Sequence, residues 1–233
     1  MNRAVKGFTI VELMLAMGFV ASLLIAISVT TIQISNIYNR GVTLKDVNQS
    51  GVAIADELQR NIKESTSFSI KAGQGHYVNQ GDDKGGRLCL GNYSYIWNYG
   101  TSLDNVNNLS NKYSEISQNY SNPIRIIKVA DPDNSYCLDM SEPIYYDKTT
   151  ELLNGGQHDL ALHGFSISMS DSAVDFKTGQ ALYNISFIIG TNDKSAFIKD
   201  SATCLPPTAA NSDPSYCYIN DFNIVARSGN VIK

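Results

Sequence analysis

Residues 7–34 read GFTIVELMLAMGFVASLLIAISVTTIQI, and the only formal charge in this stretch is that of Glu12. About 20 apolar residues, each rising about 1.5 Å along a helix, span the roughly 30 Å hydrocarbon core of a bilayer. A central acid costs about 3 kcal/mol on an insertion scale, which the surrounding Leu, Ile, Val and Phe side chains outweigh. The stretch therefore predicts a membrane-spanning helix. Its single acid is a functional hypothesis that needs a partner.

Residues 1–7 form a short basic leader that carries Arg3 and Lys6. Positive charge beside an apolar span predicts a cytoplasmic N-terminus, with everything after about residue 35 facing outward. An ordinary secretory signal requires a small-residue cleavage site on the far side of its apolar region, and no Ala-x-Ala site is convincing there. Residues 23–31 offer small side chains, but the apolar pattern continues through them. The alternative cut lies before the run, between Gly7 and Phe8.

The segment Gly7-Phe8-Thr9-Ile10-Val11-Glu12-Leu13 resembles the processing and methylation motif of the type IV pilin-like family. The resemblance is specific over residues 1–35, weaker to about residue 65 and architectural beyond. It implies cleavage after Gly7 by a prepilin peptidase, N-methylation of Phe8, and a charge pair between the new amino group of Phe8 and Glu12 of a neighbouring subunit. Removing one partner of such a desolvated pair typically costs several kcal/mol.

Residues 35–67 continue as an amphipathic helix, which we expect to form a stalk. Apolar residues recur at helical spacing along one stripe, and no proline interrupts residues 8–67, so one continuous helix is predicted. Gly18, Gly41 and Gly51 each weaken this helix by up to about 1 kcal/mol relative to alanine. The stripe consists of Ile37, Leu44, Val47, Gly51, Ile54, Leu58 and Ile62.

Residues 68–233 change to short alternating segments separated by Gly, Asn, Ser, Asp and Pro, which predicts one β-rich outer domain. The expected fold class is α+β: a long N-terminal α-helix packed on a C-terminal antiparallel β-sheet domain. The aromatic residues Tyr93, Tyr95, Trp97 and Tyr99 are predicted to pack in the core, with an exposed binding surface as the alternative. The strand candidates are residues 87–99, 124–129, 144–147, 165–169, 182–189 and 222–227.

The four cysteines, Cys89, Cys137, Cys204 and Cys217, all fall in the outward region. An even count in an oxidising compartment suggests two disulfides, with three possible connectivities. We favour Cys204–Cys217 with Cys89–Cys137, because the first pair closes a proline-containing loop that cannot be regular structure. The pairing resembles the carboxy-terminal disulfide loop of many type IV pilins.

Sequence motifs for catalysis are lacking: there is no nucleophile elbow, phosphate loop or dinucleotide fingerprint. His158 and His163 are five residues apart, which does not place both rings on one helical face. Asp131, Asp133 and Glu142 match part of a calcium loop, but Tyr136 stands where glycine is needed. The sequence has a net charge of −4, which does not favour nucleic-acid binding. We therefore expect no enzyme activity, cofactor or metal.

The family resemblance implies a structural subunit of a type IV pilus, with a minor pilin or J-type or W-type subunit favoured by the bulky outer domain. It would sit in the inner membrane as a single-pass precursor and then join the extracellular filament. The implied partners are other pilin subunits through the N-terminal helix, the prepilin peptidase and methyltransferase, and an inner-membrane assembly platform. The alternatives are a pseudopilin of a type II secretion or DNA-uptake apparatus and a membrane-anchored adhesin or envelope enzyme that does not polymerise.

Overall fold

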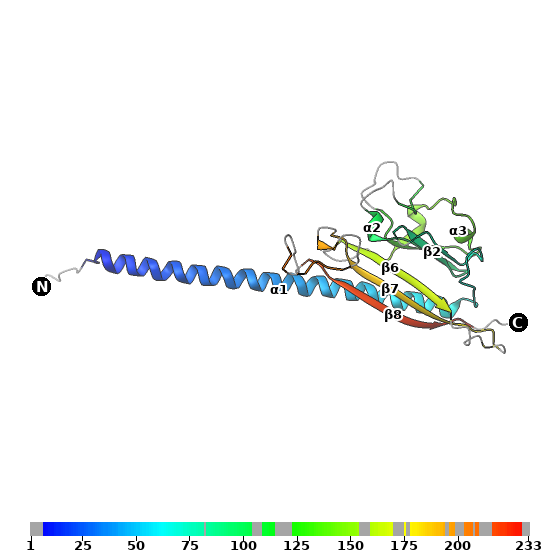
Figure 1. Cartoon of the computed structure of the whole chain (residues 1–233), viewed down its shortest axis with the longest axis horizontal. Coiled ribbons are helices and arrows are strands. Elements are labelled where there is room, and N and C mark those ends of the chain that lie inside the picture. Colours follow the sequence, from blue (N-terminus) through cyan, green and yellow to red (C-terminus); the bar gives the residue numbers. More distant parts are fainter. Residues whose placement is uncertain are drawn as a thin grey trace.

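A computed structural model of the chain describes residues 7–81, 83–103, 109–114, 123–153, 159–169, 175, 178–193, 196–198, 203–206, 208–209 and 216–229. Leader residues 1–6 and His158 lie outside these ranges. A single long helix carries a compact β-rich domain at the end remote from the N-terminus (Figure 1). The α+β class expected from the sequence is confirmed.

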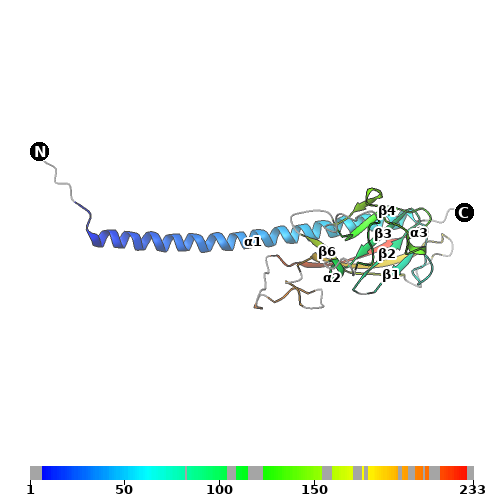
Figure 2. The same cartoon turned by 90° about the horizontal axis from the view of Figure 1, so that it is seen from above.

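Helix α1 runs without interruption over Ile10–Glu64. Thr9 caps its N-terminus, and it ends at Ser65, whose backbone N–H bonds the carbonyl oxygens of Asn61 and Ile62. The absence of proline over residues 8–67 thus produces the single helix that was predicted. The first half of α1 extends away from the rest of the chain, and the outer domain packs along the second half (Figure 2).

The outer domain contains two antiparallel sheets. Neighbouring strands in each sheet follow one another in the order of the chain. Short connections join β1 to β2 and β2 to β3, whereas longer segments join β3 to β4, β4 to β5 and β7 to β8. The five-stranded sheet comprises β1 (Tyr77–Asn79), β2 (Gly85–Cys89), β3 (Tyr93–Asn98), β4 (Ile126–Ala130) and β5 (Thr149–Glu151). The three-stranded sheet comprises β6 (Leu160–Met169), β7 (Leu182–Thr191) and β8 (Ile219–Arg227).

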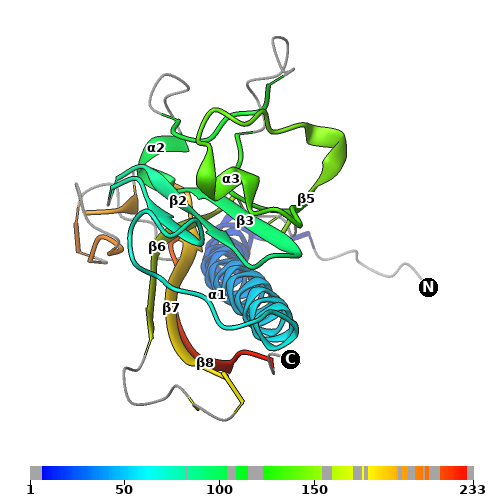
Figure 3. The same cartoon turned by 90° about the vertical axis from the view of Figure 1, so that its right-hand side faces the viewer.

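The second half of α1 lies in the angle between the two sheets (Figure 3). The predicted apolar stripe is buried from Val47 to Ile62, where it joins one core cluster with both sheets. Ile37 is 72% exposed and Leu44 39% exposed, so the outer domain does not cover the N-terminal end of the stripe. Fully buried positions of α1 begin at Thr43, and nearer the N-terminus the outer domain contacts α1 at Asn39, whose side chain bonds Tyr216.

The strand candidates were right for β4, β7 and β8. The candidate at residues 87–99 is instead divided between two paired strands, because residues 90–92 separate the end of β2 from β3. Residues 144–147 do not form a strand; Ile144 makes an isolated bridge with Tyr113, and a 3-10 helix covers Tyr146–Lys148. Strand β6 begins at Leu160, five residues before the candidate, and β1 was not anticipated. Strand β5 was not anticipated either. Both β1 and β5 are three residues long, which is too short for local alternation to reveal a strand.

A second buried cluster covers the other face of the five-stranded sheet. It includes Ile96 and Ile127 of the sheet, Tyr136 and Cys137 of the short helix α3 (Ser135–Leu138), and Ile144. The short helix α2 (Gly100–Leu103) instead follows β3 and contacts β6. The five-stranded sheet is therefore buried on both faces, whereas the three-stranded sheet keeps one polar face open.

Candidate assembly site at the start of the long helix

The motif residues lie at the free end of α1. Gly7 and Phe8 precede the first helical residue, Ile10, and both are exposed, with Phe8 at 78%. An extended, exposed peptide bond between Gly7 and Phe8 is open to a protease, because cleavage requires a locally non-helical and accessible backbone. The predicted cleavage position is thus accessible. Cleavage and methylation themselves stay predictions.

Glu12 makes a reciprocal cap with Thr9 at the helix start. The Glu12 carboxylate accepts hydrogen bonds from the Thr9 backbone N–H (3.0 Å) and hydroxyl (2.8 Å), and the Thr9 hydroxyl faces the Glu12 N–H at 3.3 Å. This is a capping box, which satisfies backbone donors that a helix N-terminus leaves without partners. Glu12 therefore has a partner within its own chain, which the sequence interpretation missed although the Thr-x-x-Glu spacing is its signature.

The surface of α1 around and beyond this cap is apolar and uncovered. The helix has the length and apolar composition of a membrane span near the N-terminus, and the most apolar window is not covered by any part of the described chain. A hydrophobic surface of this extent is not stable in water and marks a contact with lipid or protein. The exposed large side chains are Phe8, Ile10, Val11, Leu13, Met14, Leu15, Met17, Phe19, Val20, Leu23, Leu24, Ile25, Ile27, Val29, Ile32 and Ile34.

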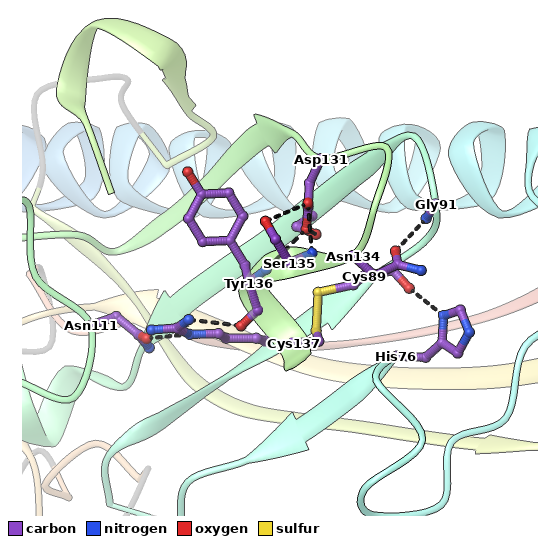
Figure 4. Close-up of a disulfide and its surroundings, with 11 residues drawn as sticks. His76, Cys89, Gly91, Asn111, Asp131, Asn134, Ser135, Tyr136 and Cys137 are labelled. Atoms are coloured by element: carbon purple, nitrogen blue, oxygen red, sulfur yellow. Dashed lines mark hydrogen bonds between the residues drawn. A yellow bond between two sulfur atoms is a disulfide. The ribbon is translucent and has the colours of Figure 1, made fainter. Parts of the chain in front are cut away.

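Both favoured disulfides, Cys89–Cys137 and Cys204–Cys217, are present. Cys89 ends β2 and Cys137 lies in α3, so the first bridge fastens the α3 segment over the second core cluster (Figure 4). The second bridge closes the carboxy-terminal loop beside β8. All four cysteines of the chain are paired.

The partial calcium-loop pattern has a structural role instead. The Asp131 carboxylate is buried and accepts hydrogen bonds from the Ser94 hydroxyl (2.5 Å), from the Ser135 N–H (2.8 Å) and hydroxyl (2.9 Å), and from the Tyr136 N–H (3.3 Å). These donors occupy the oxygens that a calcium ion would need. Within the described residues, no group of three or more His, Cys, Asp or Glu side chains is arranged for a metal ion.

The described histidines also pack against the protein. His76 Nδ1 lies 2.9 Å from the Cys89 carbonyl oxygen, and His163 Nε2 lies 2.9 Å from that of Thr191. Burial lowers the pKa of His163, and the bond to Thr191 only partly opposes that shift. His158 lies outside the described residues, so the expected lack of a histidine pair stays a prediction.

The strand aromatics mostly belong to the core, as predicted. Tyr95, Trp97 and Tyr99 are buried, and the Trp97 ring packs against Phe165 of the three-stranded sheet at a centroid distance of 4.4 Å. Tyr93 is the exception, because its ring lies under the Lys128 ammonium group, 3.6 Å from the ring centroid.

An ion pair that the sequence did not indicate ties α1 to the five-stranded sheet. Lys128 Nζ of β4 donates to Glu57 Oε1 of α1 at 2.5 Å, and Arg60 contacts the other oxygen of Glu57. Burial acts to raise the pKa of Glu57, but the hydrogen bond and charge of Lys128 outweigh it and hold that pKa below its ordinary value. Arg60 thus pairs within α1 with Glu57, three residues before it.

Comparison of this chain with protein-family models, with curated proteins and with solved structures found no match.

Proposed function

We propose that this protein is a structural filament subunit of the type IV pilin-like kind, anchored in a membrane by α1 before it assembles through the same helix. The observation that carries the proposal is the uncovered apolar half of an unbroken helix that begins with the Gly7-to-Glu12 motif. Lipid covers this apolar surface while the subunit is anchored in the membrane, and the helices of other subunits cover it in the filament. Cleavage after Gly7 and methylation of Phe8 would convert the first state into the second.

Glu12 acts in this proposal after cleavage. The new amino group of Phe8 is a cation at the apolar end of the subunit, and Glu12 is the only acid within the apolar stretch. Both bonds from Thr9 reach one carboxylate oxygen, Oε2, and an ionised carboxylate accepts up to about four donors. The Thr9 cap thus orients the carboxylate and leaves acceptor capacity for the amino group of a neighbouring subunit.

The size of the outer domain bears on which type of subunit we propose. A minor subunit of a pilus, held in the inner membrane with its N-terminus cytoplasmic, fits a domain of this size above a single span. A pseudopilin of a secretion or DNA-uptake apparatus uses the same motif, and a membrane-anchored adhesin would use the same span. The bonding of Asp131, His76 and His163 to their own chain supports a structural role rather than an enzymatic one.

Three variants separate the charge of Glu12 from its capping role. Glu12→Ala removes the charge and the cap, Glu12→Gln removes the charge but keeps a side chain that suits a capping box, and Thr9→Ala removes the cap but keeps the charge. We expect both Glu12 variants to be processed yet nearly absent from sheared surface filaments. Thr9→Ala should be incorporated, because loss of a cap costs only about 1 kcal/mol.

The measurement is mass spectrometry of the subunit in the membrane and filament fractions, which also reports cleavage after Gly7 and methylation of Phe8. Normal incorporation of Glu12→Gln would show that the charge pair is not required. An intact leader in every fraction would contradict the processing step and favour an uncleaved membrane anchor.

A further inference from the structure

The end of the outer domain that faces the N-terminal half of α1 exposes large apolar and aromatic side chains. Ile37 and Tyr38 lie on α1, whereas Ile198 and Tyr216 come from the carboxy-terminal part of the chain. The exposed fractions are 67% for Tyr38, 43% for Tyr216 and 42% for Ile198. In Figure 1 the orange segments of the domain lie at this end. We call these four residues the membrane-proximal rim.

Contacts between distant segments hold the rim at one level along α1. The Asn39 side-chain amide donates to the Tyr216 hydroxyl at 3.1 Å. The groove at this contact is lined by Asn39 and Val42 of α1 and, from the outer domain, by Thr191, Tyr216 and the polar side chains of Asp159, Asn192 and Asp193. Tyr216 therefore lies beside the turn of α1 that contains Asn39.

The second disulfide connects the segment of Ile198 to that of Tyr216. Cys217, adjacent to Tyr216, is bonded to Cys204, and Cys204 pairs with Phe197 in an isolated bridge. The backbone N–H of Ile198 also donates to the Thr203 carbonyl at 2.9 Å. The carboxy-terminal segments are thus fastened to one another and to α1 at the base of the domain.

Helix geometry places this level relative to a bilayer. If Ile34, the last residue of the apolar run, lies at the outer boundary of the hydrocarbon core, Tyr38 lies four residues or about 6 Å along the axis beyond that boundary. The headgroup layer extends roughly 5–8 Å beyond each side of a hydrocarbon core of about 30 Å. Tyrosine side chains favour this layer, where the ring is partly buried and the hydroxyl stays hydrated. The exposed Arg40 follows, and its long side chain suits the same zone.

We propose that, before assembly, the membrane-proximal rim rests in the outer headgroup layer of the membrane, so that the outer domain is held against the bilayer rather than standing free on its helix. The proposal rests on the proposed function in one respect: α1 must span the membrane over residues 8–34. The occupant of the rim is then the lipid headgroup region, which Ile198 and Tyr216 reach only because the fold brings them beside Asn39.

The test uses the full chain in nanodiscs of phosphatidylcholine and phosphatidylglycerol that contain a lipid with a nitroxide on its headgroup. Because every native cysteine is paired, an added cysteine is the only free thiol for a fluorescent label. Tyr38→Cys reports the depth of α1, Ile198→Cys reports the rim of the outer domain, and Leu138→Cys is the control. Leu138 is 69% exposed and belongs to α3, at the far end of the domain (Figure 1).

We expect the labels at positions 38 and 198 to lose most of their fluorescence to the nitroxide lipid and the label at 138 to keep it. Quenching at 38 without quenching at 198 would overturn the rim proposal while leaving the membrane span intact. Quenching at neither position would contradict the span itself. Quenching at 198 that needs a second copy in the disc, rather than lipid alone, would assign the rim to subunit contacts and also overturn the proposal.

A second reporter avoids the extra thiol beside the Cys204–Cys217 bridge. Trp97 is the only tryptophan of the chain and is fully buried, so it gives a background that headgroup nitroxides do not reach. Tyr216→Trp preserves an amphipathic ring and should add fluorescence that the nitroxide lipid removes. Emission from Tyr216→Trp that the lipid leaves unchanged would contradict the proposal independently of the labelled variants.

Discussion

At the scale of single residues, the best-defined polar site of the outer domain is the Asp131 carboxylate. It is 3% exposed, and its donors come from β3 and from the start of α3. Buried polar groups are nearly always hydrogen-bonded. If a partner is removed, the desolvation of the remaining group is uncompensated and costs about 1–3 kcal/mol. Asp131 therefore holds α3, and with it the Cys137 end of the first disulfide, in place over the sheet.

Asp131→Asn should destabilise the outer domain. An amide keeps the shape of the side chain but replaces an acceptor oxygen with a donor group that faces the N–H and O–H donors of Ser94, Ser135 and Tyr136. We expect a loss of about 1–3 kcal/mol in the free energy of unfolding, measured by chemical denaturation of the full chain in detergent. Asp133→Asn is the matched control, because Asp133 is exposed and close by; equal losses in the two variants would contradict the role given to Asp131.

At the scale of the elements, α1 and β8 approach closely because Gly51 has no side chain. A Cβ atom built at Gly51 would overlap the ring of Phe222, which in turn stacks on Phe187 at a centroid distance of 5.3 Å. The sequence interpretation treated Gly18, Gly41 and Gly51 alike, as weak points of the helix. The structure separates them, since a Cβ at Gly18 or Gly41 would meet nothing within 4 Å.

Gly51→Ala and Gly41→Ala should therefore change stability in opposite directions. Alanine favours a helix over glycine by about 1 kcal/mol, which Gly41→Ala should gain, whereas overpacking against Phe222 typically costs about 1–3 kcal/mol in Gly51→Ala. Thermal unfolding of the full chain in detergent measures both. Phe222→Ala removes the ring that a Cβ atom at residue 51 would overlap. The double variant Gly51→Ala with Phe222→Ala should therefore lose less stability than the sum of the losses in the two single variants. Stabilisation by Gly51→Ala alone would show that the Phe222 ring moves aside freely.

At the scale of the whole molecule, His163 lies where the two sheets meet. It is the bulged residue between Leu162 and Gly164 of β6, and its ring lies 5.0 Å from the Phe197 ring. The neighbouring residue Leu162 forms a parallel bridge with Tyr99 of the other sheet. A charge placed on this imidazole would be desolvated at the junction of the sheets.

The folded protein should lose stability in mild acid because burial lowers the pKa of His163. The unfolded chain takes up a proton near its ordinary pKa of about 6.5, while the folded chain resists it, so the unfolded state binds more protons below that pH. The contribution is fully present above about pH 6.5 and decreases as the pH falls. Unfolding free energies of the wild type and of His163→Gln, compared from pH 7.5 to about pH 5, should show the steeper decrease in the wild type. Parallel curves would contradict a neutral folded imidazole.

Much of the helix and part of the candidate site could be predicted from local sequence. The apolar run, the lack of proline over residues 8–67 and the Thr9-x-x-Glu12 spacing act between residues a few positions apart, so they specify α1 without reference to the rest of the fold. The cysteine pairing was favoured from one short loop. The strands were found where alternation was strong and missed where, as in β1 and β5, the strand is only three residues long.

The sequence by itself determined that this protein has one long helix with an apolar first half, a lone acid near its start and a disulfide-bonded β-rich domain after it. Only the tertiary structure decided that this helix lies in the angle between two sheets, that Gly51 admits Phe222, that Glu57 pairs with Lys128 and that Tyr216 reaches the level of Asn39. The physical reason is sequence separation: helix formation and capping depend on neighbours, whereas these contacts join residues about 70 to 180 positions apart and depend on the packing of the whole core.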